Sequence, residues 1–432
     1  MTIGVAEAIR AQLKAKNVAD YEIYSKAVEE LTITGKSGNF EQIETRLTTD
    51  HGLRVIADGR IGLTAMSEDG DPAQLVSDCL ETAAYGKEAR FRFPSHSYPA
   101  TPFKPSTYSA QDAVAYLADL CAKLQPDIPF DQLNASASLT SRRVAVANSS
   151  GLDARYGKNK HVLSISAALK HSNQRIGRSV LATDTLEFPD QYLDDLKTLY
   201  KAQDNRIALP SGRYPVIFSP FALWSLLWRI QEGVSGYSLL YGLTPLKDKL
   251  NQAIFPESLT IYDNPGDSLL FDDEGTPTSK KAIIDKGVFR AFLFDLHTAA
   301  ETNNQPTGNG FKRGFWTESV DTPVTTGFSQ LEVAPGETTK QDMFATDGAL
   351  LVEDIIGAHS GNIVQGQYSM GGSLCYWVEK GEIKGLVDDI MIAGNVYEDF
   401  KNISAISKEQ YLTDGFTVPY VLFKELSVVG KG

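Results

Sequence analysis

The sequence predicts an α+β protein with an N-terminal helix and antiparallel-sheet domain, a middle α+β segment and a β-rich C-terminal domain. Two kinds of pattern support this fold class. Between residues 20 and 65, and again between 133 and 170, apolar residues alternate with period two, and each set follows an amphipathic helical segment. From Tyr214 onward most apolar runs are short and bounded by glycine, which is typical of a sandwich or barrel-like body.

The first unit, residues 1–90, begins with a helical pattern over residues 4–16. Strands are then predicted at 21–26, 30–34, 52–57 and 60–65. Asp58 and Gly59 form a hairpin turn signal, so we expect an antiparallel sheet. A second helix is predicted to begin with Asp71 as its N-cap and Pro72 in its first turn.

The proline-rich residues 91–108 predict a linker. The middle segment, 109–211, opens with a helix from Ser109 to Leu124, which Ser109 caps. Strands are predicted at 133–139, 143–148, 152–156 and 161–170, with a turn over 148–151. The C-terminal domain, 212–432, starts with a buried strand that runs into a helix, with Ser219 as N-cap and Pro220 as first helical residue.

Composition limits the classes of function. A chain of 432 residues favours two or three domains, and 42% apolar with 22% charged residues is usual for a soluble globular protein. The net charge of −13 argues against nucleic acid as a partner. Because the sequence contains neither a basic leader nor an apolar run of 18 residues, we expect no membrane association and a cytoplasmic location.

No motif in the sequence predicts a catalytic centre, a metal site or a cofactor. The three cysteines are far apart, and none of the six histidines has a second ligand at metal-binding spacing. Ser235 and Ser369 both lie outside a nucleophile elbow, and residues 308–314 are one residue too long for a dinucleotide fingerprint. Asp272-Asp273-Glu274 is the densest acidic cluster of the C-terminal part, and we expect a structural turn there in preference to a cation site or an acid–base dyad.

A succession of short motifs adds a family resemblance. These motifs are Phe271–Thr278, Ile283–Asp295, Thr307–Gly310, Gly366–Gly372, Trp377–Ile383 and Ile392–Asn395. In order and spacing they resemble the C-terminal domain of the TldD/PmbA family, also called the modulator of DNA gyrase family, and in particular its PmbA (TldE) branch. The resemblance covers most of the chain and is weakest around residues 95–210.

The resemblance implies a vacated metal site. TldD members carry a metal-binding His-Glu-x-x-x-His on the helix that corresponds to residues 220–233. When Leu226-Leu227 is matched to the apolar pair before that motif, Trp228, Arg229 and Gly233 take the places of the first His, the Glu and the second His. The resemblance therefore implies a subunit without a catalytic metal.

Such a subunit is expected to pair with a metal-bearing TldD-like paralogue, or with a second copy of itself, around a chamber in which unfolded peptides are cut. Glycine content makes two loops candidates for lining that chamber. The candidate peptide- or partner-binding residues in them are Gly308, Asn309, Arg313, Tyr368 and Ser369. Two alternatives remain, a stand-alone peptidase with an unrecognised site and a binding module that regulates DNA gyrase.

Overall fold

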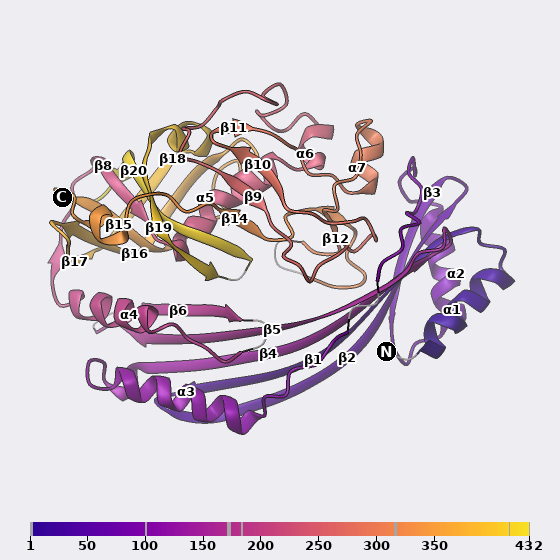
Figure 1. The fold of residues 1–432 in the computed structure, drawn as a ribbon, viewed down its shortest axis with the longest axis horizontal. Coiled ribbons are helices and arrows are strands. Elements are labelled where there is room, and N and C mark those ends of the chain that lie inside the picture. The colour runs from indigo at the N-terminus through magenta and orange to yellow at the C-terminus, as the bar shows by residue number, and fades with distance from the viewer. Residues whose placement is uncertain are drawn as a thin grey trace.

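The computed structural model describes residues 3–99, 102–170, 174–182, 185–314, 318–413 and 415–431. Within these residues, six antiparallel strands form one sheet, here called the long sheet, which curves beneath a larger C-terminal body (Figure 1). The C-terminal body comprises the elements from residue 206 onward. Helices and strands are mixed throughout, so the α+β fold class predicted from the sequence is confirmed.

The elements of the N-terminal half supply the long sheet and the helices around it. They are α1 (Ile3–Ala15), β1 (Asp20–Lys36), β2 (Asn39–Ala57), β3 (Arg60–Ser67), α2 (Pro72–Ala83), α3 (Ala110–Leu124), a 3-10 helix (Phe130–Gln132), β4 (Leu133–Asn148), β5 (Asp153–Ala168), β6 (Arg175–Ala182) and α4 (Asp190–Ala202).

The C-terminal body contains the remaining elements. Its helices are α5 (Pro220–Gly233), α6 (Gly236–Leu240), α7 (Leu296–Glu301), α8 (Lys340–Phe344), α9 (Val396–Asp399) and a 3-10 helix (Phe400–Asn402). Its strands are β7 (Arg206–Ile207), β8 (Gly212–Phe218), β9 (Ile261–Asp263), β10 (Lys281–Asp285), β11 (Val288–Phe289), β12 (Gly310–Phe311), β13 (Thr325–Thr326), β14 (Leu331–Val333), β15 (Ala349–Ile356), β16 (Gln367–Glu379), β17 (Glu382–Val387), β18 (Ile390–Asn395), β19 (Ile403–Thr413) and β20 (Phe416–Val429).

The long sheet has the strand order β3-β2-β1-β4-β5-β6. Its central contact joins β1 to β4, with a register that runs from Glu22 opposite Asn148 to Lys36 opposite Asn134. Strands from both sides of the proline-rich residues 91–108 therefore share one sheet. The domain boundaries expected from the sequence stay a prediction.

Pairs of predicted short strands are continuous in the structure. Residues 21–26 and 30–34 are parts of β1, and the predicted strands of the middle segment merge in the same way into β4 and β5. The period-two alternation of apolar residues is interrupted because the segments that pack against the two faces change along each strand. Near the start of β1, Ile23 packs with α1 and α2 on one face, whereas Tyr24 packs against residues of the C-terminal body on the other.

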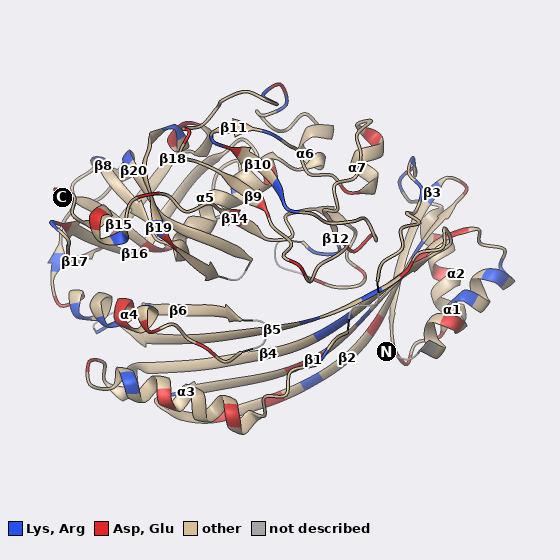
Figure 2. Cartoon of the chain, in the orientation of Figure 1, with Lys and Arg blue, Asp and Glu red and all other residues tan. Residues whose placement is uncertain are grey.

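The helices cover one face of the long sheet. Ile23 contacts the core of α1 and α2, and Ile33, an even number of positions further along β1, contacts the core of α3. Side chains an even number of positions apart on a strand share a face, so these helices lie on the same side of the long sheet (Figure 1). The core around α3 also includes residues of the C-terminal body, among them Leu351 and Tyr376. The strands β4 and β5 carry basic residues at mid-length, including Arg142 and Lys158 (Figure 2).

The C-terminal body is built on a second, mixed sheet. Its strand order is β11-β10-β9-β14-β20-β8-β15-β16-β17-β7, with β18 and β19 attached to β20. Helix α5 contacts β15 and β20 and lies in the main apolar core of this body. No helix in the described part of the chain is long and apolar enough to cross a membrane.

Candidate functional site

Helix α5 carries the three residues that the resemblance matches to a metal motif. The predicted strand and helix are confirmed as β8 and α5, and α5 begins at Pro220 after an extended Ser219. The Ser219 side chain makes no capping hydrogen bond, so proline and the buried apolar face determine where the helix starts. Most residues of α5 are buried, which places it within the body and not on a surface.

Arg229 is fully buried in α5 and holds a loop by its guanidinium group. Nε donates to the carbonyl of Gln367 at 2.8 Å, and Nη2 donates to the carbonyls of Ala358 at 2.8 Å and Ser360 at 2.9 Å. Nη1 donates to the carbonyl of Ser225 at 2.5 Å, one helical turn earlier. Burial lowers the pKa of Arg229 to about 10, so the group remains a cation at neutral pH.

Gly233 is at the C-terminal end of α5, where the helix passes Tyr397. A Cβ atom on Gly233 would lie 1.9 Å from the hydroxyl oxygen of Tyr397. That hydroxyl donates a hydrogen bond to the carbonyl of Val364 at 3.1 Å. Glycine is therefore required here by close packing.

These three residues do not fit a metal ion. An indole, a guanidinium cation and a glycine offer no side-chain ligand of the kinds that bind zinc in proteins. Trp228 Nε1 instead donates to Glu232 Oε1 at 3.2 Å. In the described residues, no group of three or more His, Cys, Asp or Glu side chains is arranged to hold a metal.

A cavity of about 820 Å³ adjoins Trp228. Parts of α5, α6, α7 and β13 form its wall, together with the segments 313–314 and 323–329. The acidic, basic and imidazole side chains in the wall are Lys87, Glu232, Asp295, His297, Arg313 and Glu318. Because both signs of charge are present, the cavity suits a polar ligand better than an apolar one.

The charged groups in this wall are held by different contacts. Burial raises the pKa of Glu232. Asp295 caps α7 by accepting from the amide of Thr298 at 2.8 Å, and it accepts from the Thr326 hydroxyl at 2.6 Å. The Nδ1 atom of His297 is buried without a hydrogen-bond partner in the described chain.

Glu318 connects the cavity to the long sheet. It forms ion pairs with Lys26 on β1, at 2.9 Å, and with Arg142 on β4. Burial alone would raise the pKa of Glu318, but Arg142 and Lys26 outweigh it and lower that pKa to about 2. The carboxylate is therefore charged throughout the physiological range.

Of the five candidate binding residues, Arg313 lines this cavity. Its guanidinium group lies 4.4 Å from the ring centre of Phe311 and donates to the carbonyl of Phe328. Tyr368 and Ser369 are on β16, away from the cavity wall. Tyr368 is buried, and its hydroxyl donates to Asp399 at 2.7 Å.

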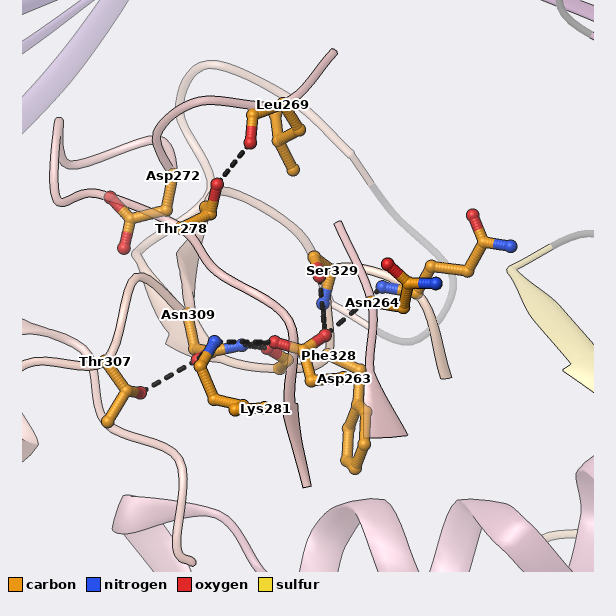
Figure 3. A network of polar contacts seen from close by, with 12 residues as sticks. Asp263, Asn264, Leu269, Asp272, Thr278, Lys281, Thr307, Asn309, Phe328 and Ser329 are labelled. Atoms are coloured by element: carbon orange, nitrogen blue, oxygen red, sulfur yellow. Dashed lines mark hydrogen bonds and ion pairs between the residues drawn. The ribbon is translucent and has the colours of Figure 1, made fainter. Parts of the chain in front are cut away.

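Asn309, which follows Gly308 in the chain, belongs to an internal network of polar contacts (Figure 3). Asn309 is fully buried, and its Nδ2 donates to Asp263 at 2.7 Å and to the carbonyl of Gly327 at 2.9 Å. Its Oδ1 accepts from Lys281 and Thr307. Gly308 has a positive φ of 72°, where a Cβ would also collide with the carbonyl of Pro277. The binding role expected for the five residues stays a prediction.

The acidic cluster at 272–274 forms a turn and joins the two parts of the molecule. Asp272 Oδ1 accepts from the amides of Glu274 and Thr276. Glu274 accepts from Arg54 on β2 at 2.7 Å, and Arg54 also donates to Glu22 on β1 at 2.8 Å. The structural turn expected from the sequence is present, and the long sheet provides its basic partner.

The cavity residues Glu232, Asp295 and His297 were not identified from the sequence. They come from α5 and from the segment at the start of α7, more than sixty positions away. No spacing signal connects these segments. The approach of α6 and α7 in the folded chain brings them together.

Comparisons with known proteins agree with this architecture. A sequence model of the PmbA/TldA metallopeptidase C-terminal domain matches residues 211–430. Metalloprotease PmbA of Escherichia coli O157:H7 is 24% identical over 425 residues, which cover 93% of this chain and 90% of that protein. A PmbA homolog of Buchnera aphidicola is 29% identical over 224 residues, and there the match spans about half of each protein.

Two solved structures share the whole fold. TldE of Thermococcus kodakarensis superposes with a TM-score of 0.86 and 23% identity, covering 98% of this chain and 99% of that one. A Thermotoga maritima protein described as a modulator of a DNA gyrase superposes with a TM-score of 0.82 and 21% identity, covering 99% of both chains. Because the family model of the C-terminal domain matches just over half of this chain, the chain belongs to the PmbA/TldD family of metallopeptidase-like proteins.

Proposed function

We propose that this chain is a non-catalytic, PmbA/TldE-like subunit that assembles with a metal-bearing TldD-like paralogue to degrade or process unfolded peptides. The main support is Arg229. Its buried cation occupies the α5 position that the sequence resemblance matches to the glutamate of the metal motif, and it is bonded to four backbone carbonyls. Family membership and the TldE-like fold are consistent with this role.

In this proposal the chain contributes binding surface and the partner contributes the metal. The cavity beside Trp228 offers both acidic and basic groups, which suits the backbone and mixed side chains of an extended peptide. Arg313 is the candidate residue for peptide binding at this wall. The cytoplasmic location expected from the sequence is part of the proposal.

The test is to co-express the chain with the TldD-like paralogue of the same organism and to assay cleavage of an unstructured peptide. We expect the two chains to co-purify and to cleave a peptide that neither cleaves alone. Metal analysis of the isolated chain should find no stoichiometric zinc or iron. One ion per chain, lost on a single substitution, would overturn the proposal.

Two further arms separate the alternatives. Arg313→Ala in the complex should raise KM several-fold with little change in kcat, whereas Arg290→Ala, at an exposed position of the C-terminal body, should leave both unchanged. Chelator-resistant cleavage by the isolated chain would instead support a stand-alone peptidase. Capture of gyrase without any peptide cleavage by the pair would support the regulatory alternative.

A further inference from the structure

The first half of β2 is an open edge of the long sheet. Residues 39–49 pair with β1 on one side. On the other side, β3 pairs only with Asp50–Ala57, and no strand of the described chain continues that pairing toward the start of β2. Residues 41–47 are all exposed, and backbone groups along such an edge are available to another strand.

Two large apolar side chains lie on this edge. Ile43 is 48% exposed and Leu47 is 72% exposed. Ile43 is directly opposite Ile33 of β1, which is buried in the core beneath α3, so both apolar side chains are on the face that the helices cover. The apolar layer under α3 thus continues to the edge of the sheet and ends there without cover.

We propose that a second copy of this chain covers this edge, with the two β2 strands pairing antiparallel about a twofold axis at Thr45. Equivalent edge strands that pair in this way keep corresponding faces on the same side of the joined sheet. Two residues opposite each other must then both be odd-numbered or both be even-numbered. This condition leaves only registers in which the axis passes through a residue.

Charge complementarity favours this register over the two adjacent ones. With the axis at Thr45, Glu44 is opposite Arg46 of the second copy, and Ile43 is opposite Leu47 of the second copy. Each contact occurs twice because the interface is symmetric. Moving the axis by one residue would place Glu44 opposite its own equivalent, or Arg46 opposite its own equivalent, and like charges directly opposite are unfavourable.

The paired edges join two long sheets into one, and the exposed apolar rims of both copies cover each other. Charged residues on an edge strand can instead have the opposite role, which is to prevent that edge from pairing with another chain. The two roles predict opposite results for a change in charge, so they can be separated experimentally. The interface concerns this chain alone and does not depend on whether the paralogue cleaves peptides.

The first test is disulfide cross-linking of the full chain under mild oxidation. The native cysteines are all buried, so a new exposed thiol reports only on its own position. Thr45→Cys should form a covalent dimer, because residues opposite each other in an antiparallel pair are within disulfide reach. Glu41→Cys, on the same strand, should stay monomeric in denaturing gels, since its two copies would be about 26 Å apart.

The second test uses charge reversal, with sedimentation equilibrium as the measurement. Arg46→Glu places acidic groups opposite each other and should weaken the dimer by at least tenfold. The double variant Glu44→Arg with Arg46→Glu restores opposite charges and should recover the affinity. Thermal melting of each variant confirms that it is folded. Absence of a dimer, cross-linking at both cysteine positions, or failure of the double variant to recover would overturn the proposal.

Discussion

At the residue scale, Gly233 makes a specific packing prediction. A methyl group there would overlap the hydroxyl of Tyr397, and a buried overlap of this kind costs about 2 kcal/mol in unfolding free energy. We expect Gly233→Ala to lower the unfolding free energy by that amount in urea titrations. Adding Tyr397→Phe removes the overlapping oxygen and should recover most of the loss.

The matched control is Gly4→Ala. Gly4 is an exposed residue of α1, and a Cβ there would meet no atom within 4 Å. Alanine is a better helix former than glycine, so this substitution should be neutral or slightly stabilising. Equal losses at both positions would show that the contact with Tyr397 does not control the effect.

Helix α5 shows which features of a site can be predicted from residue identity. The lack of metal ligands at Trp228, Arg229 and Gly233 follows from the identities of these residues and from the family resemblance. The use of Arg229 as a clamp for four carbonyls could not be predicted, because its acceptors come from α5 and from residues 358–367. Backbone acceptors carry no sequence signal.

At the scale of elements, helix starts were the most predictable feature. Ser109 accepts from the amide of Asp112, and the Asp112 carboxylate accepts from the amide of Ser109, which together form a capping box. Ser109→Ala should therefore destabilise α3 by about 1 kcal/mol. Faster amide hydrogen exchange in the first turn of α3, together with a lower urea midpoint, would show this.

Ser77→Ala is the control for that substitution. Ser77 is an exposed residue in the interior of α2, where alanine favours the helix. We expect a change of opposite sign and only a few tenths of a kcal/mol. A loss of stability at Ser77 similar to that at Ser109 would argue against the capping contribution.

Strand ends were less predictable than helix starts. Caps and prolines are local signals, whereas the apparent breaks in β1, β4 and β5 reflect which neighbour covers each face. At Glu22–Ser25 four consecutive residues are buried, which hides the period-two pattern. The cover comes from α1, α2 and the C-terminal body, and no local sequence window contains all of them.

At the scale of the whole molecule, the Glu22–Arg54–Glu274 ion pairs connect the long sheet to the C-terminal body. Burial raises the pKa of Glu274 to about 7, although Arg54 acts in the opposite direction. The Glu274 carboxyl group therefore binds a proton more tightly in the folded state than in the unfolded state. The stability from Glu274 is fully present below about pH 4.5 and is lost as the pH rises through 7, with an upper bound of about 3 kcal/mol.

Melting temperatures between pH 5 and 8 test this linkage. The wild-type Tm should fall more steeply with rising pH than the Tm of Glu274→Gln, which cannot ionise. Glu257→Gln, at an exposed position of the C-terminal body, should keep the wild-type slope. Parallel slopes for wild type and Glu274→Gln would contradict the assignment.

The pairing of β1 with β4 also has a consequence for synthesis of the chain. The β1–β2 hairpin leaves the ribosome with the β4-facing side of β1 unpaired. Its partner strand follows roughly a hundred residues later, which at cellular elongation rates takes about ten seconds. During this interval the nascent hairpin exposes a second open edge. We therefore expect the yield of folded protein to depend on chaperones that bind nascent chains.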